Sequence, residues 1–91
     1  MIARRLTVHG RVQGVFYRGW TVETARALGL NGWVRNLRTG EVEILACGEP
    51  DAVKTLIDRC RSGPPAASVT HIDVEEAEPE RHASFEQRPT A

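Results

Sequence analysis

This 91-residue chain has no excess of charge of either sign, no long apolar run and no secretory signal. Twelve lysines and arginines balance twelve aspartates and glutamates, so no long-range field favours nucleic acid or an anionic membrane as a partner. No apolar run is long enough to cross a bilayer, and residues 1–5 contain no apolar signal segment. We therefore expect a cytoplasmic protein of one domain, residues 1–91, that acts as a monomer.

Cysteine is scarce, and neither of the two cysteines indicates a reactive thiol. Cys60 belongs to an apolar stripe at helical spacing with Val53 and Leu56, which predicts a core position. Cys47 lies on a predicted strand, on the side opposite Val42, where we expect it to be partly open. No arginine-terminated loop follows Cys47, as a cysteine phosphatase would need, so nucleophilic catalysis by cysteine is not expected.

Histidine is also scarce, and its distribution does not indicate a metal site. His9, His71 and His82 lie in separate segments, and we interpret none of them as a metal ligand. His9 alternates with Val8, so it should face away from the core. We predict no metal and no cofactor.

Two strand-helix-strand units follow one another with little linker between them. The apolar patterns predict helices at about 17–28 and from about Pro50 to the stop at Gly63, and strands at about 3–10, 32–37, 41–47, 69–76 and 84–88. Gly29 is a natural end for the first helix, and residues 37–40 form a hairpin turn. The order β-α-β-β-α-β with an extra C-terminal strand predicts an α+β, ferredoxin-like two-layer sandwich, with two helices on one face of an antiparallel sheet.

The segment Gly10-Arg11-Val12-Gln13-Gly14-Val15-Phe16-Tyr17-Arg18 joins the first strand to the first helix, and its residue types suit a small anion. Glycine permits positive φ, which can turn consecutive N–H groups inward beside the helix N-terminus. Arg18 could complete such a cradle with a guanidinium. A tight turn with a solvated arginine is the structural alternative. The segment fits neither the P-loop nor the dinucleotide pattern, which favours a site for a single phosphoryl group.

A second segment, Gly32-Trp33-Val34-Arg35-Asn36, with a trailing Gly-x-Val and Gly48, makes the pattern more specific. Together the segments resemble the two signatures of the acylphosphatase family. Gly-x-Val-x-Gly-Val-x-aromatic-Arg is matched from Gly10 to Arg18, and Gly-aromatic-Val-basic-Asn is matched from Gly32 onward. Further similarity in Gly63-Pro64-Pro65 and Phe85-x-x-Arg88 extends the resemblance over almost the whole chain.

The resemblance implies hydrolysis of small acyl phosphates to a carboxylate and inorganic phosphate, with no metal. It assigns phosphate binding to Arg18 and orientation of the attacking water to Asn36. The substrate-binding residues that we expect are Gln13, Gly14, Val15, Phe16, Tyr17 and Arg18.

Two alternatives remain at this stage. Asn36 precedes a hairpin turn, where asparagine often hydrogen-bonds nearby backbone for purely structural reasons. A noncatalytic module that binds phosphate or carbamoyl phosphate would use the same cradle without needing Asn36. Trp20 and Trp33 could stack on a substrate, but we expect both to pack against the protein instead.

Overall fold

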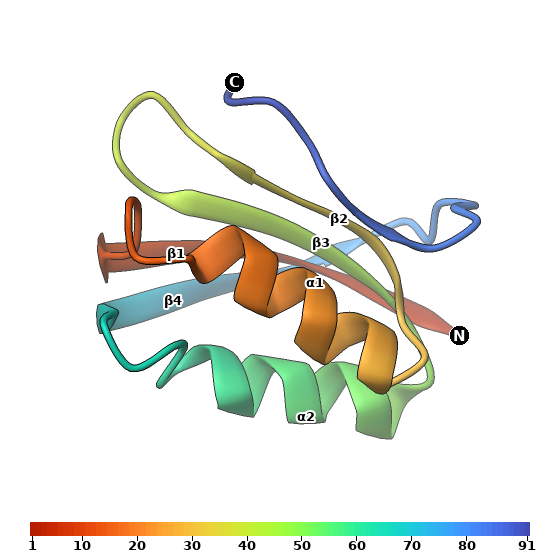
Figure 1. The fold of residues 1–91 in the computed structure, drawn as a ribbon. Coiled ribbons are helices and arrows are strands. Elements are labelled where there is room, and N and C mark those ends of the chain that lie inside the picture. Colours follow the sequence, from red (N-terminus) through yellow and green to blue (C-terminus); the bar gives the residue numbers. More distant parts are fainter.

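The computed structural model describes all of residues 1–91 and contains one five-stranded sheet with two helices (Figure 1). The helices are α1 (Tyr17–Ala27) and α2 (Pro50–Cys60), and both cover the same face of the sheet. The strands are β1 (Ile2–Arg11), β2 (Asn31–Asn36), β3 (Val42–Gly48), β4 (Ser68–Ala77) and β5 (Phe85–Gln87).

The spatial strand order, β4-β1-β3-β2-β5, confirms the predicted ferredoxin-like sandwich. The pairs formed among β1, β2, β3 and β4 are antiparallel, as predicted. The fifth strand differs, because β5 runs parallel to its neighbour β2 and the sheet is therefore mixed. Neither helix is long and apolar enough to cross a membrane.

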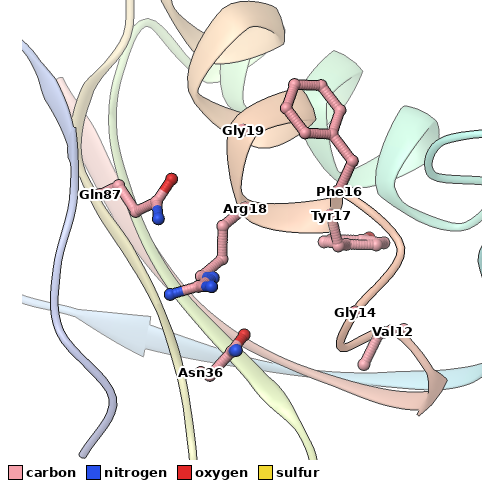
Figure 2. Close-up of a pocket in the computed structure, with 8 residues that line it drawn as sticks. All are labelled: Val12, Gly14, Phe16, Tyr17, Arg18, Gly19, Asn36 and Gln87. Carbon is pink, nitrogen blue, oxygen red and sulfur yellow. The ribbon is translucent and has the colours of Figure 1, made fainter.

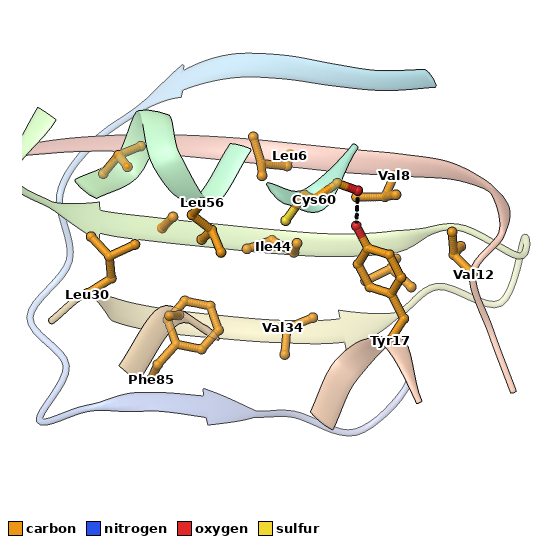
Figure 3. Packing of buried hydrophobic residues seen from close by; sticks show 14 residues of the cluster. Leu6, Val8, Val12, Tyr17, Leu30, Val34, Ile44, Leu56, Cys60 and Phe85 are labelled. Atoms are coloured by element: carbon orange, nitrogen blue, oxygen red, sulfur yellow. Dashed lines mark hydrogen bonds between the residues drawn. The ribbon is translucent and has the colours of Figure 1, made fainter. Parts of the chain in front are cut away.

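The main core lies between the helices and the sheet (Figure 3). Tyr17, Thr21 and Ala25 recur at helical spacing and form the buried face of α1. Thr21 is tolerated there because its hydroxyl donates a 2.8 Å hydrogen bond to the Tyr17 carbonyl. Cys60 is fully buried in the same core, as expected.

The end of α1 is closed by a Schellman motif around Gly29. Gly29 has φ +72° and its N–H donates to the Arg26 carbonyl at 3.0 Å. The N–H of Leu30 donates to the Ala25 carbonyl at 3.0 Å. This turn directs the chain into β2, which carries Asn36 at its far end.

A smaller apolar cluster lies on the opposite face of the sheet and corrects the expectation for Cys47. Cys47 is fully buried there with Ala3, Trp33 and Leu45. Its burial results from cross-strand packing, because Cys47 is paired with Ala3 on β1 while Trp33 and Leu45 are paired across β2 and β3. Trp33 is thus a packing residue, as expected.

Two of the histidines, although they lie in separate segments of the sequence, are neighbours in the structure. His9 on β1 and His71 on β4 are direct cross-strand partners. Next to this pair, the register shifts between His9 and Gly10. A Cβ on Gly10 would lie 2.2 Å from the Ser68 carbonyl oxygen, so the glycine permits two strands to approach rather than a ligand to bind.

Candidate active site

Residues 12–16, between β1 and α1, form a loop whose N–H groups lack partners in the protein. Gly14 and Phe16 both have left-handed backbone, at φ +74° and +67°. No N–H from Gln13 to Phe16 donates a hydrogen bond within the chain, and no side chain caps α1. The first helical bond runs from the Trp20 N–H to the Phe16 carbonyl. The loop and the first turn of α1 therefore provide a row of unused donors at the positive end of a helix.

A cavity of about 250 Å³ opens beside this loop (Figure 2). Arg18 and Asn36 both line it, although they lie on different elements. Figure 2 shows the guanidinium of Arg18 extending toward Asn36. The complete lining is Val12, Gly14, Phe16, Tyr17, Arg18, Gly19, Asn36 and Gln87.

Arg18 is half-buried and makes no ion pair with any carboxylate of the chain. A guanidinium without a carboxylate partner retains its donors for an anion that enters the cavity. Its position in the first turn of α1 adds its charge to the helix dipole and to the unpaired N–H groups of the loop. These positive features converge on the cavity.

The amide oxygen of Asn36 is buried and has no hydrogen-bond partner. An asparagine with a purely structural role at a hairpin normally accepts a hydrogen bond from neighbouring backbone with this atom. Asn36 makes no such hydrogen bond, so a purely structural role does not account for it. The backbone of Asn36 is held independently, because its carbonyl accepts a 3.0 Å hydrogen bond from the Ala91 N–H. The side chain is thus free to hold a polar atom in the cavity.

Gln13 and Val15 do not line the cavity with their side chains. The Gln13 amide donates to the carbonyls of Leu37 and Glu41, at 2.8 and 2.9 Å. These bonds join the loop to both sides of the β2–β3 hairpin, directly after Asn36. Val15 packs against the main core. Of the predicted substrate-binding residues, Gly14, Phe16, Tyr17 and Arg18 line the cavity, while Gln13 and Val15 can contribute their N–H groups only.

Tyr17 lines the cavity, but its hydroxyl is directed elsewhere. It donates a 2.6 Å hydrogen bond to the Cys60 carbonyl on α2. Burial, with the neighbouring Cys60, raises the pKa of Tyr17 well above its ordinary value of 10.0. The phenol is therefore unsuited to act as an acid or base toward a substrate.

Val12, Gly19 and Gln87 line the cavity but were not among the predicted site residues. Of these, Gln87 is the one that comes from a distant part of the sequence. It lies on β5 opposite Val34 of β2, and Figure 2 shows its amide facing the space next to Arg18. A short strand with one glutamine gives no periodic signal. The only sequence signal for Gln87 is the Phe85-x-x-Arg88 similarity, which spans this position.

Comparison with known proteins identifies the family of the chain. The family model described as Acylphosphatase matches residues 4–87, which include the whole loop, Arg18, Asn36 and Gln87. The chain belongs to the acylphosphatase family. An acylphosphatase of Rhizorhabdus wittichii is 53% identical over 98% of this chain and 90% of its own length.

Solved acylphosphatase structures agree with the fold as well as the family. The acylphosphatase of Bacillus subtilis superimposes with a TM-score of 0.93 at 38% identity, covering 97% of this chain and 99% of that one. Full-length HypF matches with a TM-score of 0.89 at 27% identity, but the match spans only 12% of its chain. The likeness to acylphosphatases is end to end, and the chain is an enzyme that hydrolyses acyl phosphates.

Proposed function

We propose that the unpaired N–H groups from Gln13 to Arg18 hold the phosphoryl group, that Arg18 neutralises its oxygens, and that Asn36 orients the attacking water. The buried, unpartnered Asn36 amide oxygen beside the free Arg18 guanidinium is the observation that carries this assignment. An asparagine carbonyl can accept a hydrogen bond from water and thereby orient it, although it cannot remove a proton at neutral pH.

The chemistry requires little more than this. The water oxygen attacks phosphorus while the bond from phosphorus to the acyl oxygen breaks, and the carboxylate leaves with the bonding electrons. A carboxylate is a weak base, so it needs no general acid. The proton of the water passes to a phosphate oxygen of the substrate. The protein then has two tasks, positioning and stabilisation of charge in a loose transition state.

The cradle is suited to stabilising that charge because its backbone donors are fixed by the fold. Donors that are already oriented need no rearrangement during the reaction, and loss of one such stabiliser typically costs about 2.7 to 4 kcal/mol. The cavity lining contains no histidine, cysteine or carboxylate side chain, so its donor set is one for anions rather than for metal ions. We propose that hydrolysis is metal-independent.

The remaining features of the proposal concern the whole chain. Every group assigned above belongs to one copy of the chain, so we propose that it acts as a monomer. We also propose that it acts in the cytoplasm and without nucleic acid. Balanced formal charge is the support for excluding nucleic acid.

Release of phosphate from benzoyl phosphate in the presence of a chelator tests the site assignment. We expect turnover to survive chelation and to fall by at least about a hundredfold in Arg18→Ala and in Asn36→Ala. Arg11→Ala is the matched control, because Arg11 is an exposed arginine of the same segment that does not line the cavity. Full activity in either site variant, or loss of activity on chelation, contradicts the proposal.

Competitive inhibition by inorganic phosphate separates the two roles. Arg18→Ala should weaken inhibition because the guanidinium contacts the phosphoryl group, whereas Asn36→Ala should leave the inhibition constant nearly unchanged. A chain that binds phosphate but shows no turnover would be a receptor. Equally weakened inhibition in both variants would indicate that Asn36 contacts the phosphoryl group rather than the attacking water.

A further inference from the structure

The face of the sheet opposite the helices carries a cluster of side chains that the proposed mechanism does not use. His9 on β1 lies directly across from His71 on β4. Asp73 lies two residues beyond His71, so it projects from the same face of β4. His9 is remote from the other two residues in the sequence, and the β1–β4 register brings it next to them.

The three side chains converge on one point. The imidazole rings of His9 and His71 are stacked, with centroids 4.0 Å apart and planes inclined by 9°. Both Nε2 atoms face the same oxygen, Oδ2 of Asp73, at 2.9 and 3.7 Å. One ligand atom from each residue lies within 4.8 Å of the other two.

We propose that His9, His71 and Asp73 bind one divalent transition-metal ion, of which Zn²⁺ is the representative. Two imidazoles and a carboxylate are ligands that Zn²⁺, Cu²⁺ and Ni²⁺ accept, whereas Mg²⁺ and Ca²⁺ prefer oxygen alone. Three protein ligands at the surface leave a fourth position for water. Binding displaces any Nε2 proton, because an imidazole coordinates through a free lone pair.

Binding requires His71 to turn out of the stack, because two nearly parallel rings cannot both direct their in-plane Nε2 lone pairs at one ion. A tetrahedral zinc with bonds of about 2.0–2.1 Å holds its ligand atoms about 3.3 Å apart. The 2.9 Å contact between His9 and Asp73 would therefore lengthen, and the 3.7 Å contact between His71 and Asp73 would shorten. His71 and Asp73 are each 58% exposed, so both side chains can rotate without disturbing the core. His9 is less mobile, at 27% exposure, and serves as the fixed ligand.

The cluster of His9, His71 and Asp73 differs from an ordinary ion pair between one histidine and one carboxylate. His82 and Glu80 form such a pair elsewhere, at 2.9 Å, with one histidine and one carboxylate. The cluster at β1 and β4 differs because a second imidazole is stacked on the first and directed at the same oxygen.

The position of the cluster indicates a structural role. His9 immediately precedes the register shift at Gly10, beyond which β1 pairs with Val69 and Ser68 of β4 before the chain enters the phosphate loop. A metal ion would join the two strands at this irregular point. The cluster lies outside the cavity lining, so the ion would increase stability without entering the reaction.

Competition between the metal-free chain and a chromophoric chelator for Zn²⁺ tests the site. We expect one equivalent to bind, and affinity to fall by at least about tenfold in His71→Ala and in Asp73→Asn. His82→Ala is the matched control and should bind as the unaltered chain does. Thermal unfolding gives a second readout, because Zn²⁺ should raise the midpoint in the unaltered chain and not in His71→Ala.

Hydrolysis of benzoyl phosphate in the presence of chelator verifies that each variant is folded, since neither His71 nor Asp73 belongs to the proposed catalytic machinery. Equal Zn²⁺ affinity in the unaltered chain and in His71→Ala overturns the metal site. Loss of binding in His82→Ala to the same degree also overturns it. Neither result affects the assignment of Arg18 and Asn36.

Discussion

Two left-handed residues, Gly14 and Phe16, give the phosphate loop its shape at the scale of single residues. Phe16 adopts this conformation despite its side chain, which is 66% exposed and packs over the first turn of α1. Gly19 makes room for the ring, because a Cβ there would lie 2.3 Å from the Phe16 Cε1 atom. Strained backbone of this kind persists where the surrounding structure requires it, often at functional sites.

Gly14→Ala should reduce activity far more than its effect on stability explains. Gly14 and Gly29 have nearly the same φ, +74° and +72°, and a Cβ at either position meets nothing within 4 Å. Each alanine variant should therefore lose about 1–2 kcal/mol of unfolding free energy. Only Gly14 lies in the cavity, so only Gly14→Ala should redirect the N–H donors and lower kcat/KM, by at least about tenfold.

Urea unfolding and benzoyl phosphate hydrolysis, measured on both variants, check this expectation. Gly29→Ala is the control for backbone strain alone, because Gly29 lies at the end of α1 opposite the cavity. Equal losses of activity in the two variants would show that strain, rather than the direction of the loop donors, limits turnover.

Single residues also show how far the sequence could predict the site. Arg18 and Asn36 close two motifs, and the cavity indeed brings them together. The side-chain contacts of Gln13 with the hairpin could not be predicted, because they depend on the position of β3 relative to the loop. Gln87 reaches the cavity only through the pairing of β5 with β2, which leaves no local pattern.

At the scale of secondary-structure elements, one hydrogen bond joins the two helices. The Tyr17 hydroxyl of α1 donates to the Cys60 carbonyl of α2, inside the core (Figure 3). Burial raises the pKa of both side chains, that of Cys60 from 9.0 to about 12 and that of Tyr17 well above 10.0. The folded chain therefore keeps two protons that the unfolded chain releases in alkaline solution.

The free energy of unfolding should fall as pH rises above about 9. A group whose folded pKa is raised contributes stability that is complete below its unfolded pKa and is lost above it, because the unfolded state then binds fewer protons. From about pH 8 to about pH 10.5 we expect a loss of about 2–3 kcal/mol. Tyr17→Phe and Cys60→Ala should each make the pH dependence less steep, with the larger effect from Cys60→Ala.

Urea unfolding at several pH values measures this dependence. Tyr17 is the only tyrosine of the chain, so tyrosinate absorbance reports on it directly and should appear only as the protein unfolds. Tyrosinate in the folded protein near pH 10 would show that the phenol is accessible and would contradict the prediction.

The elements themselves were largely predictable, and the exceptions have physical reasons. Both helices follow from apolar residues at helical spacing, and the hairpin follows from Gly40, which has φ +111°. The parallel direction of β5 did not follow, because a strand of three residues has no pattern and its pairing depends on the preceding connection. The burial of Cys47 could not be predicted, because it depends on which side chains lie beside it on the neighbouring strands.

At the scale of the whole molecule, the charge and length of the edge strands bear on whether the sheet can pair with other chains. The outer strand β4 carries Asp73, Glu75 and Glu76, and like charges on an exposed edge disfavour pairing with a second copy. At the other edge, β5 is only three residues long. Large exposed apolar side chains are limited to Met1, Phe16 and Val74, which belong to separate segments.

The chain should therefore remain a monomer of about 10.1 kDa over a wide range of concentration. Light scattering on a size-exclusion column, at about 10 and about 200 μM, measures the mass directly, and specific activity should not change between these concentrations. A variant with Glu75→Val and Glu76→Val tests the reason, because removing the charges from the β4 edge should permit association at the higher concentration. A dimer of the unaltered chain at the lower concentration would show that the edge charges do not prevent pairing, and the monomer proposal would fail.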